Sequence, residues 1–288
     1  MATIDASLQP SPTATRTASR ASAGSRRALR TLVRRRFALN IRTPRELLVP
    51  LLTPVLFALV IAPALADQIP TVRGIDYMSF VAIATVGLLL PLNCMLAGIG
   101  LFVERDSGAR RDLIAAPLRR PLLVLGNLAV ALAVSGLQLA VLIAAAVLRG
   151  AEFSGTATGI AWFLVASTGL VVVMYGVAET LASRIPSQEE YVGALPAVAI
   201  VPWFFAGSLF PIGAMPAALA AFAKVLPLTH ALAVMRYGLV DPRGVGLHDI
   251  WGMSSPTVMA GLSLAVIAAY AALFTVVAVT VFRRATVR

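Results

Sequence analysis

The fold is decided by the segment Glu104-Arg105-Asp106-Ser107-Gly108-Ala109-Arg110-Arg111-Asp112-Leu113-Ile114-Ala115-Ala116-Pro117-Leu118-Arg119-Arg120. Eight of its seventeen residues are charged, whereas the flanking runs Tyr77–Val103 and Pro121–Leu148 carry no charge. Each run is long enough to cross a bilayer as a helix. We therefore expect the segment to be the charged tip of a membrane hairpin. Its mixed charges and its apolar patch at Leu113 favour contact with another protein; the alternative is charge that only stops membrane transfer.

The composition places the chain among membrane proteins. Hydrophobic residues make up 59% of it and charged residues 13%, whereas about a quarter of the residues of an average soluble domain are charged. The apolar runs are continuous and do not alternate with polar residues, which disfavours a β-barrel. The predicted fold class is therefore all-α integral membrane.

The basic residues indicate orientation and not nucleic-acid binding, although the formal net charge is +11. Of 24 basic residues, ten lie in 1–46, five in 105–120 and three after Phe282. Such clusters are typical of one side of a membrane and not of a nucleic-acid groove. With both termini in the cytoplasm, nineteen basic residues are inside and five outside. We expect a multi-pass protein of the cell membrane with no nucleic-acid partner.

The N-terminal region divides into two parts. Residues 1–24 are a low-complexity basic tail that cannot form a core. Residues 25–45 carry apolar residues at helical spacing and arginines around them, including Arg30, Arg34 and Phe37. This pattern predicts an amphipathic helix in the lipid headgroup layer, with Arg toward anionic lipid. The simpler interpretation is a positively charged anchor, and both can hold together.

Residues 46–288 form the predicted membrane domain of six helices, with termini inside. The expected spans are Leu47–Ala66, Met78–Val103, Leu122–Leu148, Ile160–Leu181, Tyr191 to about Ala206, and Thr257–Phe282.

The fifth apolar run continues to Ala223, which is too long for one crossing. Its Gly and Pro residues predict a turn over 207–216 and a short outer helix, Ala217–Leu226. Thr229 is the expected N-cap of a further helix, His230–Val240, and Asp241–Asp249 is expected to be a polar turn. This outer re-entrant element lies between the fifth and sixth spans.

Few polar residues lie within the spans. Asn93 is predicted to hydrogen-bond between helices. Glu179 is near a helix end, so we expect it to be solvated or paired with an arginine. His230 and His248 are isolated and are expected at a helix cap or the surface.

The chain lacks the motifs of catalysis and nucleotide binding. Lys224 is the only lysine and follows no Gly-rich loop, so we expect no ATP site. No His-Glu-x-x-His motif occurs, and Cys94 is the only cysteine. We expect no catalytic residue, no metal site and no cofactor held by this chain.

Two motifs together resemble the membrane subunit of type-2 ABC exporters. Glu104-Arg105-Asp106-Ser107-Gly108 through Pro117, with Arg120 and Gly126-Asn127, is similar to the Glu-Arg-(x)-x-Gly-Thr loop of that family; Ala109 replaces the usual Thr. The second motif comprises Phe204-Phe205-Ala206-Gly207-Ser208-Leu209-Phe210-Pro211, Met215-Pro216, Leu226-Pro227-Leu228-Thr229-His230-Ala231 and Arg236-Tyr237-Gly238. It is similar to the outer re-entrant pattern of the family, with Ala206 and Leu226 where Ser and Asn are common.

The resemblance implies that the chain is the permease subunit of an exporter, and it implies two groups of site residues. The first loop would hold a cytoplasmic coupling helix that docks on an ATPase through Glu104, Arg105, Asp106, Gly108, Arg110 and Leu113. The outer gate would be shaped by Gly207, Phe210, Pro211, Met215 and Pro216. The implied partners are separate ATPase subunits that bind ATP and Mg, a second permease copy (identical or a paralogue), membrane lipids and lipophilic cargo.

The resemblance is strongest to daunorubicin-resistance-type exporters of drugs or lipids. Exporters of lipid-linked polysaccharide or teichoic acid share the expected topology and remain an alternative. A membrane-embedded lipid-modifying enzyme would need converging polar residues inside the spans, where the sequence offers only Asn93, Asn127 and Gln138. A secondary transporter would show intramembrane ionisable residues and repeated halves.

Overall fold

The structure is a computed structural model that describes residues 71–106, 108 and 120–285, together with isolated positions between 48 and 69. Several predictions from the sequence fall outside these residues. They are the tail, the interfacial helix with Arg30, Arg34 and Phe37, most of the first span, and Arg110 and Leu113 of the charged loop.

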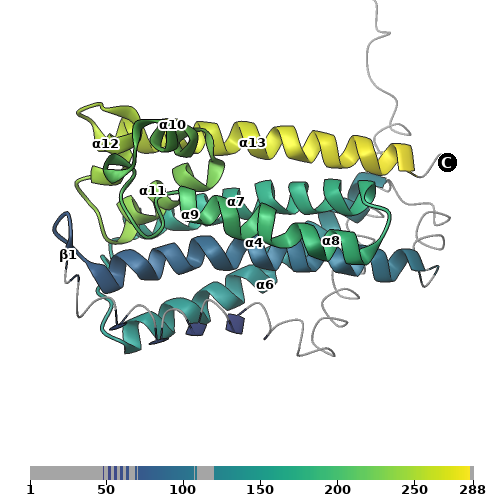
Figure 1. Ribbon diagram of the computed structural model, residues 1–288, viewed down its shortest axis with the longest axis horizontal. Coiled ribbons are helices and arrows are strands. Elements are labelled where there is room, and N and C mark those ends of the chain that lie inside the picture. The colour runs from purple at the N-terminus through teal and green to yellow at the C-terminus, as the bar shows by residue number, and fades with distance from the viewer. Residues whose placement is uncertain are drawn as a thin grey trace, which may run out of the picture.

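Four long helices run side by side and form the body of the protein (Figure 1). They are α4 (Tyr77–Asp106), α6 (Arg120–Leu148), α7 (Ala157–Arg184) and α13 (Pro256–Ala285). By length and composition, each of these four can cross a membrane. The prediction of a helical membrane protein is therefore confirmed. The central helix is α7, which packs against α4, α11 and α13.

The predicted fifth span is helical but not a regular α-helix. It consists of α8 (Gln188–Leu195), the π-helical turn η2 (Pro196–Ile200) and α9 (Val201–Phe205). Pro202 has no backbone N–H and its ring crowds the carbonyl of Val198, which explains why the α-helical bonding pattern is interrupted here. The N–H of Val201 instead donates to the carbonyl of Pro196, five residues earlier, so the turn widens.

The chain then turns sharply through α10 (Ala217–Val225) and α11 (Pro227–Leu239), whose axes meet at 85°. Leu226 is extended between them, at φ −72° and ψ 128°, because a residue before proline is excluded from the helical region. The N-cap prediction for Thr229 was wrong. Pro227 supplies the first helical residue, so the helix begins earlier and Thr229 lies within it.

One end of the bundle, which we call the hairpin end, carries the short elements. Strands β1 (Thr71–Val72) and β2 (Ile75–Asp76) pair antiparallel, with Val72 opposite Ile75. Arg73 and Gly74 both have positive φ, as a two-residue hairpin turn requires. The 3₁₀ turn η3 (Ile212–Ala214) and the helix α12 (Val245–Trp251) lie at the same end. The expected polar turn over 241–249 is thus partly helical.

The opposite end, which we call the loop end, carries the C-terminus of α4, the N-terminus of α6 and the connection from α7 to α8 (Figure 1). The predicted charged loop 104–120 therefore does join two membrane helices. Asn93 on α4 donates to the hydroxyl of Ser135 on α6 at 2.6 Å, which confirms the predicted interhelical hydrogen bond.

Tertiary packing buries two polar residues, so the prediction of a solvated Glu179 and of a surface position for His230 was wrong. Glu179 is 1% exposed and accepts a hydrogen bond from the hydroxyl of Tyr175, one helical turn earlier. His230 is also buried, and its Nε2 lies 2.9 Å from the carbonyl oxygen of Lys224. Ser263 on α13 lies 3.2 Å from its Nδ1 and also accepts from the indole of Trp251. His230 therefore links α10, α11 and α13.

A close backbone crossing joins α7 to α11 and gives the first prediction. A Cβ atom on Gly159 would lie 2.1 Å from the carbonyl oxygen of Gly238, and neither backbone can move independently of its helix. We expect Gly159→Ala to destabilise the folded protein by about 2 kcal/mol. Thermal denaturation of the purified protein in detergent measures this.

The matched control is Gly136→Ala on α6, where an added Cβ would meet no atom of the described residues within 4 Å. This substitution should leave stability unchanged or raise it by roughly 0.5 kcal/mol, since Ala favours helix over Gly. Equal stabilities of the two variants would contradict the close crossing.

Candidate functional site

At the loop end, Arg105 ties the last turn of α4 to the connection between α7 and α8. Its Nη2 donates to the carbonyl oxygen of Pro186 at 2.6 Å, and its guanidinium lies 4.8 Å from the ring centroid of Phe102. Arg105 itself is exposed and Glu104 is partly exposed. The predicted coupling residues therefore begin at a helix end that is held to a second pair of helices.

Gly108 follows the end of α4 in the left-handed conformation, with φ +75°. Its N–H donates to the carbonyl of Arg105 at 3.3 Å, as in a glycine helix cap. Among the described residues, no atom lies within 4 Å of a Cβ added there, and the positive φ favours glycine. Gly108 thus sets the direction in which the charged loop leaves the helix.

The surface around the hydrogen bond from Arg105 to Pro186 is polar. Arg184, Glu189 and Glu190 are exposed at the end of α7 and the start of α8. Ser187 caps α8 by accepting from the N–H of Glu190 at 3.2 Å. The loop end therefore presents charges of both signs at the ends of two helices.

At the hairpin end, Arg236 near the end of α11 holds three elements together. It is 6% exposed, and it donates to the carbonyl oxygens of Gly207 at 2.7 Å and Ser208 at 2.8 Å. The guanidinium also lies 3.5 Å from the ring centroid of Phe80 on α4. A buried charge is tolerated only with such partners, so the turn after α9 has to fold against α11.

The predicted gate residues lie in this turn, between α9 and α10. Gly207 has φ +77°, and a Cβ there would lie 2.9 Å from Cγ1 of Ile212. Pro211 precedes η3, Met215 follows it, and Pro216 precedes α10. Phe210 is 58% exposed. The structure therefore places all five on one continuous segment, whose first residue is held by Arg236.

An ion pair joins the hairpin to α12 and to η3. Arg73 Nη1 lies 2.6 Å from Oδ1 of Asp249, and Oδ2 of Asp249 accepts from the N–H of Gly213 at 3.2 Å. Asp241 nearby accepts from the N–H of Gly246 at 3.1 Å. Burial raises the pKa of Asp241, while its backbone hydrogen bonds and Arg236 act in the opposite direction.

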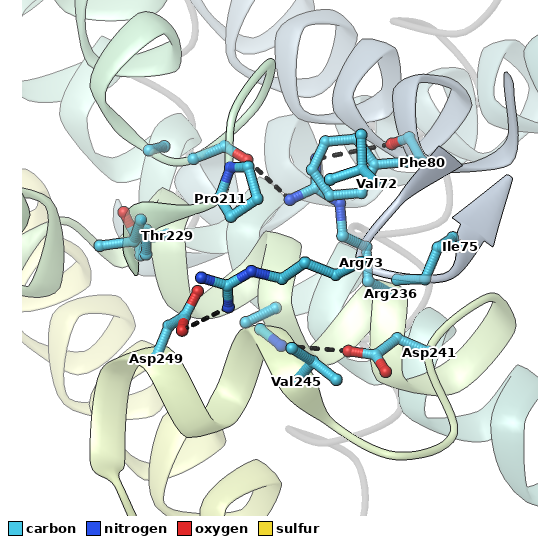
Figure 2. A pocket seen from close by; sticks show the side chains of 15 residues that line it. Val72, Arg73, Ile75, Phe80, Pro211, Thr229, Arg236, Asp241, Val245 and Asp249 are labelled. Carbon is cyan, nitrogen blue, oxygen red and sulfur yellow. Dashed lines mark hydrogen bonds and ion pairs between the residues drawn. The ribbon is translucent and has the colours of Figure 1, made fainter. Parts of the chain in front are cut away.

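These groups line a small pocket, shown in Figure 2. It lies between the β1–β2 hairpin, the turn after α9, α11 and α12. Gly207 and Pro211 line it, whereas Phe210, Met215 and Pro216 do not. The polar side chains among the lining residues are Arg73, Thr229, Arg236, Asp241 and Asp249.

The sequence alone did not single out these polar residues as site residues, and Thr229 was expected only as an N-cap. Arg236 occurs in the second motif but has no distinguishing spacing, and Arg73, Asp241 and Asp249 resemble ordinary loop charges. Among the described residues, no group of three or more His, Cys, Asp or Glu is arranged to hold a metal ion.

Two comparisons with known proteins bear on this arrangement. The family model described as ABC-2 type transporter matches residues 27–240, about three quarters of the chain. The match covers the charged loop, the turn after α9 and α11. A search of curated proteins finds no match.

The buried position of Arg236 gives the second prediction. The substitution Arg236→Met keeps a long side chain but removes the donor to the buried carbonyls of Gly207 and Ser208. We expect a loss of folding stability of about 3 kcal/mol, measured by denaturation in detergent.

The exposed Arg243 in the same region provides the control, and Arg243→Met should change stability by less than about 0.5 kcal/mol. Equal effects of the two substitutions would show that Arg236 does not hold the turn.

Proposed function

Since this chain belongs to the ABC-2 type transporter family, we propose that it is the permease subunit of an exporter that carries lipophilic cargo and is driven by a separate ATPase. Two permease subunits and two ATPase subunits would form the working transporter. ATP and Mg would be bound by the ATPase, and the permease would contribute the pathway and the docking surface.

The anchoring of the charged loop supports this proposal more than any other observation. The loop leaves α4 at the Gly108 cap, beside the hydrogen bond from Arg105 to Pro186. A partner that pushes on the loop therefore acts on α4 and, through Pro186, on α7 and α8. A loop that served only to stop membrane transfer would need no such connection.

The charge distribution supports a cytoplasmic position for the loop end. Nineteen of the 24 basic residues lie in segments that the six-span topology puts on that side. The remaining five are Arg73, Arg149, Lys224, Arg236 and Arg243. In this orientation the ATPase meets the charged loop, and the hairpin end faces outward.

The proposed mechanism is mechanical. Nucleotide-driven movement of the ATPase displaces the loop, and α4 transmits the displacement along its length. Phe80, near the other end of α4, contacts Arg236, which holds the turn at Gly207 and Ser208. Movement of α4 therefore alters the segment that carries Phe210, Pro211 and Met215, where the outward exit would open.

The surface supports lipophilic cargo of the drug or lipid type. Large apolar side chains are exposed along the helices, among them Leu137, Val141, Leu164, Leu273 and Val276. Such surfaces face lipid, a second permease or cargo. Exporters of the daunorubicin-resistance type carry cargo of this class.

Two substitutions in the loop test the coupling. Glu104→Ala removes a partly exposed charge. Gly108→Pro is incompatible with φ +75° and lacks the N–H that donates to the carbonyl of Arg105. We expect both to reduce transport and permease-stimulated ATP turnover by about tenfold, with membrane insertion unchanged. Co-purification with the ATPase and ATP hydrolysis in reconstituted vesicles measure this.

The matched control is Glu152→Ala. Glu152 is exposed and lies between α6 and α7, at the hairpin end. This variant should keep the stimulation of the unaltered protein. Full stimulation in Glu104→Ala and Gly108→Pro would rule out the charged loop as the coupling element.

A further inference from the structure

Two buried side chains of α11 line the pocket at the hairpin end, and each has a hydrogen-bonding atom without a partner in the part of the chain that the structure describes. These atoms are Oγ1 of Thr229 and Nε of Arg236. Thr229 is 1% exposed and Arg236 is 6% exposed, so water at the outer surface does not satisfy either atom. Buried polar atoms are nearly always hydrogen-bonded, to protein or to ordered water, so the two atoms indicate a ligand in the pocket.

The size of the pocket limits this ligand to a molecule as small as water. Its cavity measures about 30 Å³. A buried water molecule needs roughly 10–15 Å³ of such space, so the pocket has room for about two water molecules. A cavity of this size excludes a drug or a lipid.

The lining also provides the hydrogen-bond partners that a buried water molecule requires. Water can accept from the Nε–H of Arg236, and it can donate to the hydroxyl of Thr229 or accept from it. The carboxylates of Asp241 and Asp249 line the same pocket. Each carboxylate has two oxygens and can accept from water in addition to the backbone N–H groups that it already binds.

The charges around the pocket favour water over a halide ion. Arg73 is paired with Asp249, and the carboxylate of Asp241 attracts the buried Arg236. With two groups of each sign, the lining has no net positive charge that would compensate an anion. A neutral ligand therefore fits this pocket better than chloride does.

We propose that this pocket holds bound water that hydrates the buried guanidinium of Arg236 from within the protein, with one molecule at Nε and one at Thr229 Oγ1. The carbonyl oxygens of Gly207 and Ser208 accept from the two terminal nitrogens of the guanidinium, and water satisfies the third nitrogen. The bound water thus completes the set of contacts that holds the turn after α9 against α11. It requires neither the ATPase nor ATP, so its failure is distinct from failure of the proposed transport.

Thr229→Val tests for the water through the sign of its effect on stability. The substitution removes the hydroxyl and keeps the shape of the side chain. Because a hydroxyl bonded to water loses a hydrogen bond when it is removed, we expect the melting temperature of the full-length protein in detergent to fall by about 3 °C. A buried hydroxyl without any partner destabilises the fold, so an unchanged or higher melting temperature would overturn the proposal.

The matched control for this measurement is Ser208→Ala. The hydroxyl of Ser208 is also buried without a partner among the described residues, but Ser208 does not line the pocket. We therefore expect Ser208→Ala to leave the melting temperature unchanged or to raise it. An equal fall in both variants would overturn the assignment of water to Thr229.

Replacing chloride in the buffer by gluconate distinguishes water from a bound halide. The melting temperatures of the unaltered protein and of Thr229→Val should respond equally to this exchange. A fall that occurs in the unaltered protein and is absent from Thr229→Val would identify a chloride ion and overturn the proposal of water.

Radiolytic footprinting detects the water itself. A short X-ray pulse converts water, including bound water, into hydroxyl radicals that oxidise neighbouring side chains, and peptide mass spectrometry maps the oxidised residues. Phe80 lines the pocket and Phe163 does not, although they are 4% and 5% exposed. We expect Phe80 to be oxidised several times faster than Phe163, and we expect Ala233→Val, which fills the cavity, to remove this difference. Equally slow oxidation of the two rings, or oxidation of Phe80 that Ala233→Val leaves unchanged, would overturn the hydrated pocket.

Discussion

The hairpin end depends on the buried guanidinium of Arg236. Its charge is accommodated by the carbonyl oxygens of Gly207 and Ser208 and by the face of Phe80, which come from two separate parts of the chain. Loss of either carbonyl oxygen or of the Phe80 ring would leave part of the charge in an apolar interior without a partner. The turn after α9, the start of α4 and the end of α11 therefore form one unit, and the pocket, the ion pair of Arg73 with Asp249 and η3 are arranged around it.

Helix α4 connects this unit to the opposite end of the bundle. Phe80 lies in its first turn and Arg105 in its last, about 37 Å apart at 1.5 Å per residue. Along that length, Asn93 bonds to Ser135 of α6, and Ala84 accepts from the indole of Trp203 on α9. These bonds hold α4 to α6 and α9 between its two ends. In the proposed transporter, this is how a displacement of the cytoplasmic loop reaches the outward turn.

The long helices could be predicted from the sequence, and the hairpin end could not. The span predicted as Leu122–Leu148 is observed as Arg120–Leu148, because charge and apolar runs fix such boundaries locally. Proline likewise marked the turn near Gly207 and the break at Pro227. The burial of Glu179 and His230 depends on helices distant in sequence, and Arg73 and Asp249 pair across 176 positions. No local pattern distinguishes such residues from exposed loop charges, so the pocket was missed.

In the proposed transporter, nucleotide binding by the ATPase docked on the loop end changes the conformation of the hairpin end. It is tested most directly by the distance between spin labels at Leu148 and Ala218, both exposed, on α6 and α10. The distance distribution is measured by pulsed electron paramagnetic resonance in the reconstituted complex, without nucleotide and with bound ATP. We predict that ATP shifts the distribution, and that Gly108→Pro prevents the shift. The same distribution in both states would contradict transmission through α4.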